Sequence, residues 1–108
     1  MNRITKSNSQ IIVQPETNLE SSTADAFRKA LLKAVSQNDS DLVIDLSKVS
    51  NIDSVGLGVF IATYNTIAKK EKKLKVINAS QRIRSLFQTM GLTRRFKVDG
   101  KDASGADS

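Results

Sequence analysis

The chain has 108 residues, a length that suits one domain with a hydrophobic core. It contains no cysteine and no histidine, which excludes disulfides, thiolate or imidazole metal sites, and Ser–His or Cys–His nucleophilic machinery. The formal net charge is +6, and no apolar run approaches the roughly 20 residues of a membrane-spanning helix. No apolar signal region follows the first residues, so we expect a cytoplasmic, monomeric protein that has no membrane association and no cofactor.

The first half of the chain predicts two strands, a helix and a third strand. Residues 1–8 are a short polar lead that suits an edge strand, and the β-branched run 11–13 predicts a second strand. Apolar residues at helical spacing follow Ser22, which we expect to be the N-cap, with Asp25 completing a weak capping box. The short apolar run 42–46 is typical of a strand covered on both faces.

The second half continues the alternation. A helix is predicted over 55–70, and a strand over 73–78. Ser80 is expected to cap a third helix, and a short last strand should contain Phe96 and Val98. The predicted inward face of the middle helix consists of Leu57, Phe60, Ile61, Tyr64, Ile67 and Ala68.

This order of elements predicts a single α/β domain in which helices pack on a mixed sheet of four to five strands. We place that domain at residues 1–98. Residues 99–108 are small and polar, and we expect them to be a flexible C-terminal tail.

The segment most indicative of a functional site is residues 53–58, DSVGLG, where a loop enters the middle helix. One interpretation of Ser54 is a plain N-cap, since serine is common there. The other is a phosphate acceptor at the positive end of a helix dipole. Gly56 and Gly58 favour the second interpretation, because glycines cost helix stability but allow another backbone to approach. Close packing of the helix on the sheet is the structural alternative for both glycines.

Basic residues cluster at 69–75 and at 94–97. A lysine-rich helix end explains the first cluster, since cations stabilise the C-terminus of a helix. No aromatic residues interleave with these lysines, so we expect no nucleic-acid partner. The charge can still steer an acidic protein partner.

Three segments together resemble the STAS domain family (sulfate transporter and anti-sigma factor antagonist), and within it the stand-alone bacterial anti-sigma factor antagonists. They are residues 18–24 (NLESSTA), the pair 42–47 (LVIDLS) and 52–58 (IDSVGLG), and residues 86–96 (LFQTMGLTRRF). The resemblance covers roughly residues 11–98.

The resemblance implies a partner switch. The unmodified protein would bind a GHKL-type serine kinase that acts as an anti-sigma factor, and would be released when that kinase phosphorylates Ser54 with ATP. A PP2C-type, metal-dependent serine phosphatase would reset it. The partner-binding residues implied at the matching positions are Asp53, Ser54, Val55, Gly56, Gly58 and Val59.

The chain departs from the family pattern at two places. Val55 stands where a second hydroxyl is often found, and residues 14–17 (QPET) replace the usual glycine-initiated turn before the first helix. Partner contacts at that turn are therefore expected to differ.

The sequence also bears on three other classes of protein. A receiver domain would need an acidic pair after its first strand to hold magnesium, and residues 11–15 supply none. An enzyme would depend on Asp45, Asp53 and Tyr64, which form no spaced catalytic set, so we expect no enzymatic activity. The remaining alternative keeps the fold without this switch, as an accessory subunit of an ABC-type lipid transport complex or a partner switch with another output.

Overall fold

The protein is described by a computed structural model over residues 2–7, 9–37 and 39–100, and its elements follow the predicted order. The strands are β1 (Asn2–Lys6), β2 (Gln10–Pro15), β3 (Asp41–Asp45), β4 (Leu74–Ala79) and β5 (Lys97–Gly100). The helices are α1 (Ala24–Gln37), α2 (Ser54–Lys69), α3 (Gln81–Thr89) and the short 3₁₀ helix η1 (Leu92–Arg94).

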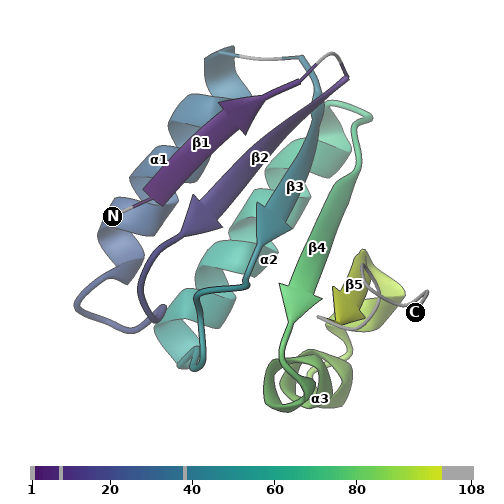
Figure 1. Cartoon of the computed structure of the whole chain (residues 1–108). Helices are drawn as coiled ribbons and strands as arrows, with labels where there is room; N and C mark the ends of the chain where they lie inside the picture. Colours follow the sequence, from purple (N-terminus) through teal and green to yellow (C-terminus); the bar gives the residue numbers. More distant parts are fainter. Residues whose placement is uncertain (1, 8, 38, 101–108) are drawn as a thin grey trace.

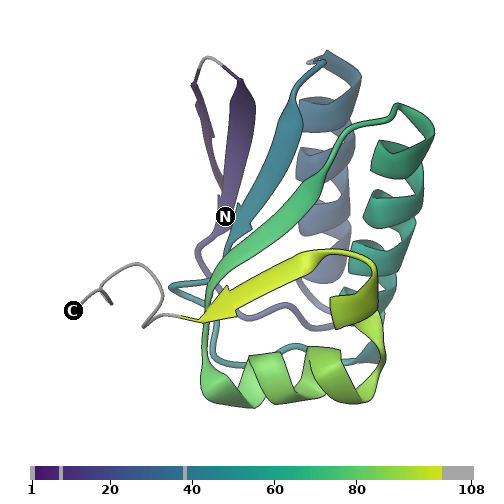
Figure 2. The ribbon, with the colours of Figure 1, turned by 90° about the vertical axis from the view of Figure 1, so that its right-hand side faces the viewer.

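The strands form one five-stranded mixed sheet in the order β1-β2-β3-β4-β5 (Figure 1). β1 pairs antiparallel with β2 at the edge, which confirms the predicted edge strand, and the other neighbours pair in parallel. Right-handed crossovers between consecutive parallel neighbours place their helices on the same face of a sheet. Accordingly α1 and α2 lie side by side on one face, and α3 lies across the lower end of the sheet (Figure 2).

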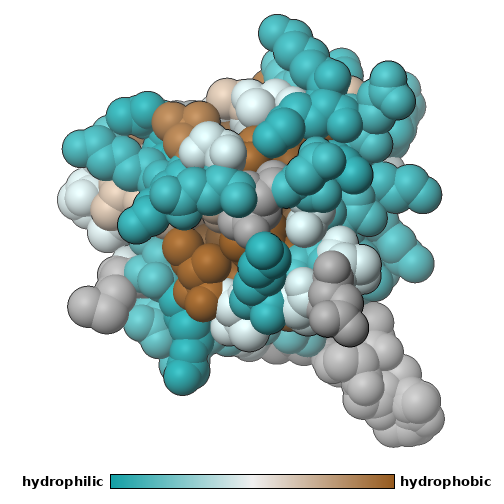
Figure 3. Space-filling view, turned by 90° about the horizontal axis from the view of Figure 1, so that it is seen from above, coloured by the Kyte–Doolittle hydropathy of each residue, from teal (hydrophilic) through white to brown (hydrophobic). Residues whose placement is uncertain are grey.

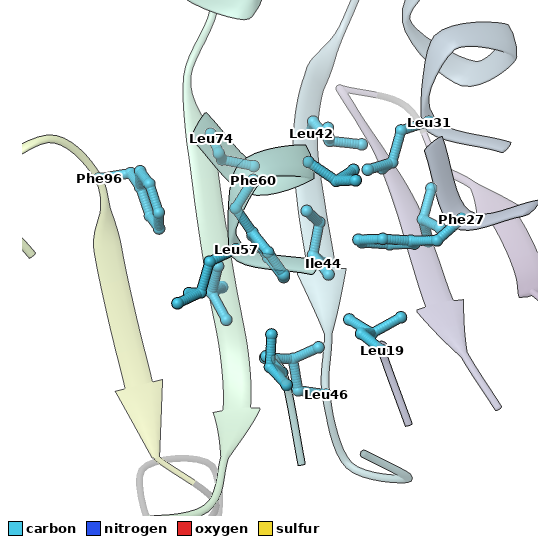
Figure 4. Packing of buried hydrophobic residues seen from close by; sticks show 14 of the residues in the cluster. Leu19, Phe27, Leu31, Leu42, Ile44, Leu46, Leu57, Phe60, Leu74 and Phe96 are labelled. Carbon is cyan, nitrogen blue, oxygen red and sulfur yellow. The ribbon is translucent and has the colours of Figure 1, made fainter. Parts of the chain in front are cut away.

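The hydrophobic core fills the space between the sheet and these helices. Phe27 of α1, Phe60 of α2 and Phe87 of α3 are fully buried, and Phe60 packs against both other rings at centroid distances of 5.5 and 5.1 Å. Figure 4 shows Phe27 and Phe60 projecting toward Ile44 of β3. Phe60 therefore links the packing of all three helices.

The inward face of α2 differs in part from the predicted one. Ile61 is 38% exposed and Ala68 is also exposed, whereas Val59 and Thr63 are buried. The reason is that α2 packs against α1 as well as against the sheet, so the buried surface is turned toward α1. Among the described residues, none of the helices has the length and apolar character needed to cross a membrane.

The start of α1 also differs from the prediction. The helix begins at Ala24, so Ser22 is not its N-cap. The Thr23 hydroxyl instead accepts a hydrogen bond from Glu20 N and donates one to the carbonyl of Asn18. Asp25 forms no capping box; it pairs with Arg28 and Lys29, and the hydrogen bond from Arg28 holds the pKa of Asp25 below its ordinary value.

The last strand extends past the predicted domain end at residue 98. Asp99 and Gly100, expected in the tail, belong to β5, where Gly100 pairs with Ala79 and Asp99 forms an ion pair with Lys75. The pairing with β4 continues through these small residues although they give no apolar signal in the sequence. The rest of the predicted tail, residues 101–108, lies outside the described residues.

Candidate functional site

Ser54 lies where the loop after β3 enters α2, at the lower end of the sheet (Figure 1). It is the first residue of the helix and is exposed to solvent. Among the described residues, the Ser54 hydroxyl forms no hydrogen bond. The hydroxyl is therefore accessible to a second protein.

The N-cap of α2 is Asp53, which corrects the prediction that Ser54 caps the helix. Asp53 Oδ1 accepts hydrogen bonds from Val55 N at 3.0 Å and from Gly56 N at 3.1 Å. These bonds satisfy N–H groups that have no partner within the helix. Ser54 follows one residue later, as the first residue of the helix, and its side chain takes no part in the cap.

The loop before α1 packs against the loop before α2, so that the two form one surface. Asp53 Oδ2 accepts from Ser21 N at 3.0 Å, and Asp53 N donates to the carbonyl of Leu19. Asn18 Oδ1 accepts from Ser50 N and Asn51 N at 2.8 and 3.1 Å. We call residues 18–23 and 50–54 together the paired loops. Their hydrogen bonding was not predicted, and Asn18 within the 18–24 motif is the sequence signal that hints at it.

The two glycines of the motif have different surroundings. Gly56 is buried, and a Cβ at its position would lie 2.6 Å from the carbonyl oxygen of Leu19 and 2.9 Å from Ile52 Cγ2. Gly56 thus permits close packing of α2 on the paired loops and is covered by them, which does not suit the direct partner contact expected of it. Gly58 is exposed, and a Cβ there would meet nothing within 4 Å. The open, low surface expected around Ser54 is therefore found at Gly58.

The two valines of the motif also separate. Val55 is 48% exposed and places an apolar side chain at the surface beside Ser54. Val59 is 7% exposed and lines a shallow apolar hollow between α1 and α2, together with Leu32. Asp53, Ser54, Val55 and Gly58 therefore form the accessible part of the candidate site, and Gly56 and Val59 lie beneath it.

The fold does not bring the three candidate catalytic residues, Asp45, Asp53 and Tyr64, into one site. Asp45 ends β3, where its carboxylate accepts from Ser47 N at 2.9 Å and Asn78 Nδ2 at 3.1 Å. Tyr64 lies about 15 Å along α2 from Ser54, at 1.5 Å per residue, and its ring packs on Phe96. Within the described part of the chain, no group of three or more acidic side chains is placed to hold a metal ion.

Comparison with known proteins identifies the family. The model of the STAS domain family matches residues 2–103. The anti-sigma-B factor antagonist of Bacillus subtilis (strain 168) is 36% identical over 83 residues, which cover 77% of this chain and 75% of that protein. The two chains are therefore related along most of their lengths.

Solved structures agree with this relationship. An anti-sigma factor antagonist from Mycobacterium paratuberculosis matches with a TM-score of 0.80 and 26% identity, over 91% of this chain and 84% of that one. The unphosphorylated form of the anti-sigma factor antagonist SpoIIAA matches with a TM-score of 0.72, 15% identity, and coverage of 99% and 96%. The phosphorylated form of Bacillus SpoIIAA matches with 0.73, 16%, and coverage of 99% and 97%. This chain thus belongs to the STAS domain family, and its relatives within that family are anti-sigma factor antagonists.

Proposed function

We propose that this protein is an anti-sigma factor antagonist whose unphosphorylated form binds a GHKL-type serine kinase that serves as the anti-sigma factor. Phosphorylation of Ser54 by that kinase, with ATP, releases the protein, and a PP2C-type phosphatase restores it. The observation that carries the proposal is the exposed Ser54 hydroxyl, which takes no part in the cap of α2. The curated relatives are anti-sigma-B factor antagonists, which favours this function over that of a subunit in a transport complex.

The surface around Ser54 suits a protein partner. Val55 supplies exposed apolar area, and Gly58, one helical turn on from Ser54, leaves open space above the helix. The hydrogen bonds of Asp53 to both Ser21 and the helix hold the paired loops in a fixed shape. A partner that docks here pays little ordering entropy on this side of the interface.

A phosphoryl group on Ser54 would act through charge. It adds about −1.5 to −2 charges at pH 7. The N–H groups of Val55 and Gly56, which could offset part of this charge, are already engaged by Asp53. At an interface shaped for a neutral hydroxyl, the phosphate must lose its water beside the Asp53 carboxylate. An unpaired buried charge costs several kcal/mol, a large part of the roughly 8–12 kcal/mol of micromolar to nanomolar binding.

Calorimetric titration with the cognate kinase tests this proposal. We expect Ser54→Ala to bind with an affinity close to that of the unmodified protein, because a hydroxyl without a structural bond is removed. Ser54→Asp should bind about 100-fold more weakly or worse, because it places a second carboxylate beside Asp53. Ser36→Asp, the same substitution at an exposed position of α1, controls for a general effect of one added negative charge. Equal affinities of the Ala and Asp variants would refute a charge-gated interface.

A further inference from the structure

The shallow apolar hollow between α1 and α2 is a feature that the proposed switch at Ser54 does not use. It has a volume of about 220 Å³. Buried side chains from both helices line it, among them Val35 and Val59, and the exposed Leu32 and Ala62 border it. The two helices lie side by side (Figure 1), so the hollow is part of the groove between them. We call it the interhelical hollow.

The interhelical hollow begins beside the candidate site. Val59 lies four residues after Val55, and Thr63 four residues after Val59, so their side chains follow one face of α2. Val55 is exposed at the Ser54 end of this row, whereas Val59 and Thr63 line the hollow. Gly58 has no side chain that would separate the two surfaces, and a Cβ there would meet open space. The apolar surface next to Ser54 therefore continues into the hollow.

The opposite end of the groove is bridged by a lysine. Lys70 Nζ, at the end of α2, donates a hydrogen bond of 2.7 Å to the carbonyl of Val35 in the last turns of α1. Figure 3, which looks down on this end of the molecule, shows hydrophilic side chains over much of its surface. A partner therefore reaches the hollow across the outer surface of the two helices, next to Ser54, and not from this end.

One protein interface is wide enough to include both Ser54 and the hollow. At a rise of 1.5 Å per residue, Ala62 lies about 12 Å along α2 from Ser54. A standard interface covers about 800 Å² on each partner, a patch roughly 30 Å across. A protein that docks on Ser54 can therefore cover the hollow with the same face.

The size and lining of the hollow favour a side chain of a protein over a free small molecule. Its volume of about 220 Å³ is below the range of about 300–1,000 Å³ that is usual for small-molecule sites. Two of its polar groups are already engaged within the chain. The Thr66 hydroxyl donates to the carbonyl of Ala62, and the Arg28 guanidinium pairs with Asp25 at 2.7 Å. Leu32, which is 48% exposed, adds apolar area at the border.

On the basis of the proposed function, we propose that the interhelical hollow is an anchor of the kinase interface. An apolar side chain on a helix of the kinase inserts between α1 and α2 at Leu32 and Val59, in the way that amphipathic helices bind apolar grooves. Well-packed apolar anchors carry much of the binding energy of an interface. The hollow thus supplies affinity, and Ser54 supplies the charge gate.

Calorimetric titration of the cognate kinase with variants of the hollow tests this proposal. Leu32→Gln removes exposed apolar area, and Ala62→Gln places a longer side chain over the hollow, so each should weaken binding about tenfold. The matched controls are Met90→Gln, at a similarly exposed apolar residue, and Ala68→Gln, on another face of α2, and both should leave affinity unchanged. An unchanged affinity for either hollow variant, or an equal loss in its control, would overturn the proposal.

Folding and independence from the switch are checked with the same variants. All four substituted positions are exposed, so each variant should fold, and thermal unfolding followed by circular dichroism verifies this. If Leu32→Gln fails to fold, Ala62→Gln still tests the hollow, because it removes no buried side chain. The tenfold loss should persist in a Ser54→Ala background, since distant sites contribute independently.

The outcomes separate this inference from the proposed function. A kinase that does not bind the unmodified protein would overturn both. A kinase that discriminates Ser54→Ala from Ser54→Asp but binds the hollow variants like the unmodified protein would overturn the anchor alone. Sedimentation equilibrium of the protein without the kinase tests a second copy as the occupant. A dimer that Leu32→Gln dissociates would assign the hollow to self-association and overturn the proposal.

Discussion

The Asp53 carboxylate accepts hydrogen bonds from Val55 N and Gly56 N, and the neighbouring Ser54 hydroxyl remains exposed. Capping and the proposed modification thereby fall on two adjacent side chains. If Ser54 were the cap, phosphorylation would change the very group that accepts the hydrogen bonds of the helix start. With Asp53 as the cap, the hydroxyl can be modified while those bonds persist.

Substitution of Asp53 measures its structural role. Asp53→Ala removes the acceptor of three backbone N–H groups, those of Ser21, Val55 and Gly56, and should lower the free energy of unfolding by about 1–2 kcal/mol. Asp53→Asn keeps an oxygen that can cap the helix and should cost less. Urea denaturation of the two variants checks this expectation, and an unchanged midpoint for Asp53→Ala would rule out the cap as a source of stability.

At the scale of elements, the site depends on how α2 meets the paired loops. The Leu19 backbone lies over Gly56, and a parallel bridge joins Leu19 to Ile52. The entry of α2 is thus fixed from both sides, whereas Gly58 leaves its outer surface open. Packing and the proposed partner recognition thus use different glycines of the same turn.

The two glycines form a matched pair of tests. Gly56→Ala forces its Cβ against a backbone oxygen at 2.6 Å and should destabilise the protein by about 1–3 kcal/mol. Gly58→Ala meets open space and should stabilise the helix by up to about 1 kcal/mol. Thermal unfolding distinguishes the two signs. In the proposed function, Gly58→Ala should also weaken kinase binding, because its methyl group occupies the contact surface.

The limits of prediction from sequence are clearest in these elements. Alternating apolar runs and turn signals predicted the order of strands and helices, and the spacing of residues 53–58 indicated the site. The role of Gly56 was missed because it depends on Leu19 in the 18–23 loop, which is distant in sequence from the helix it contacts. The cap was misplaced by one residue because Asp and Ser are both common N-caps, and the sequence pattern locates a helix end only to within one or two residues. Ile61 was wrongly placed inside because periodicity identifies an apolar stripe but does not show that α2 also packs against α1.

For the whole molecule, the hydrophobic core and the candidate site are located in different parts. The core is centred on Phe60, with its ring contacts to Phe27 and Phe87, and Ser54 lies outside it on the surface. A charge added at Ser54 should therefore change what the protein binds and not whether it folds.

This separation predicts opposite effects for two substitutions. Phe60→Ala should cost about 3–5 kcal/mol, a large share of the 5–15 kcal/mol typical of a domain. Ser54→Asp should change the free energy of unfolding by only about 0.5 kcal/mol, as an exposed substitution usually does. Denaturant unfolding of both variants checks the contrast. A loss of several kcal/mol in Ser54→Asp would mean that the switch acts through unfolding.

In the proposed function, Ser54 is the phosphorylated residue of a partner switch. Incubation with the cognate GHKL-type kinase and ATP, followed by intact-mass measurement, tests it most directly. We predict a mass gain of about 80 Da, the mass of one phosphoryl group, that is absent in Ser54→Ala. No gain in the unmodified protein, or a gain that persists in Ser54→Ala, would contradict the claim.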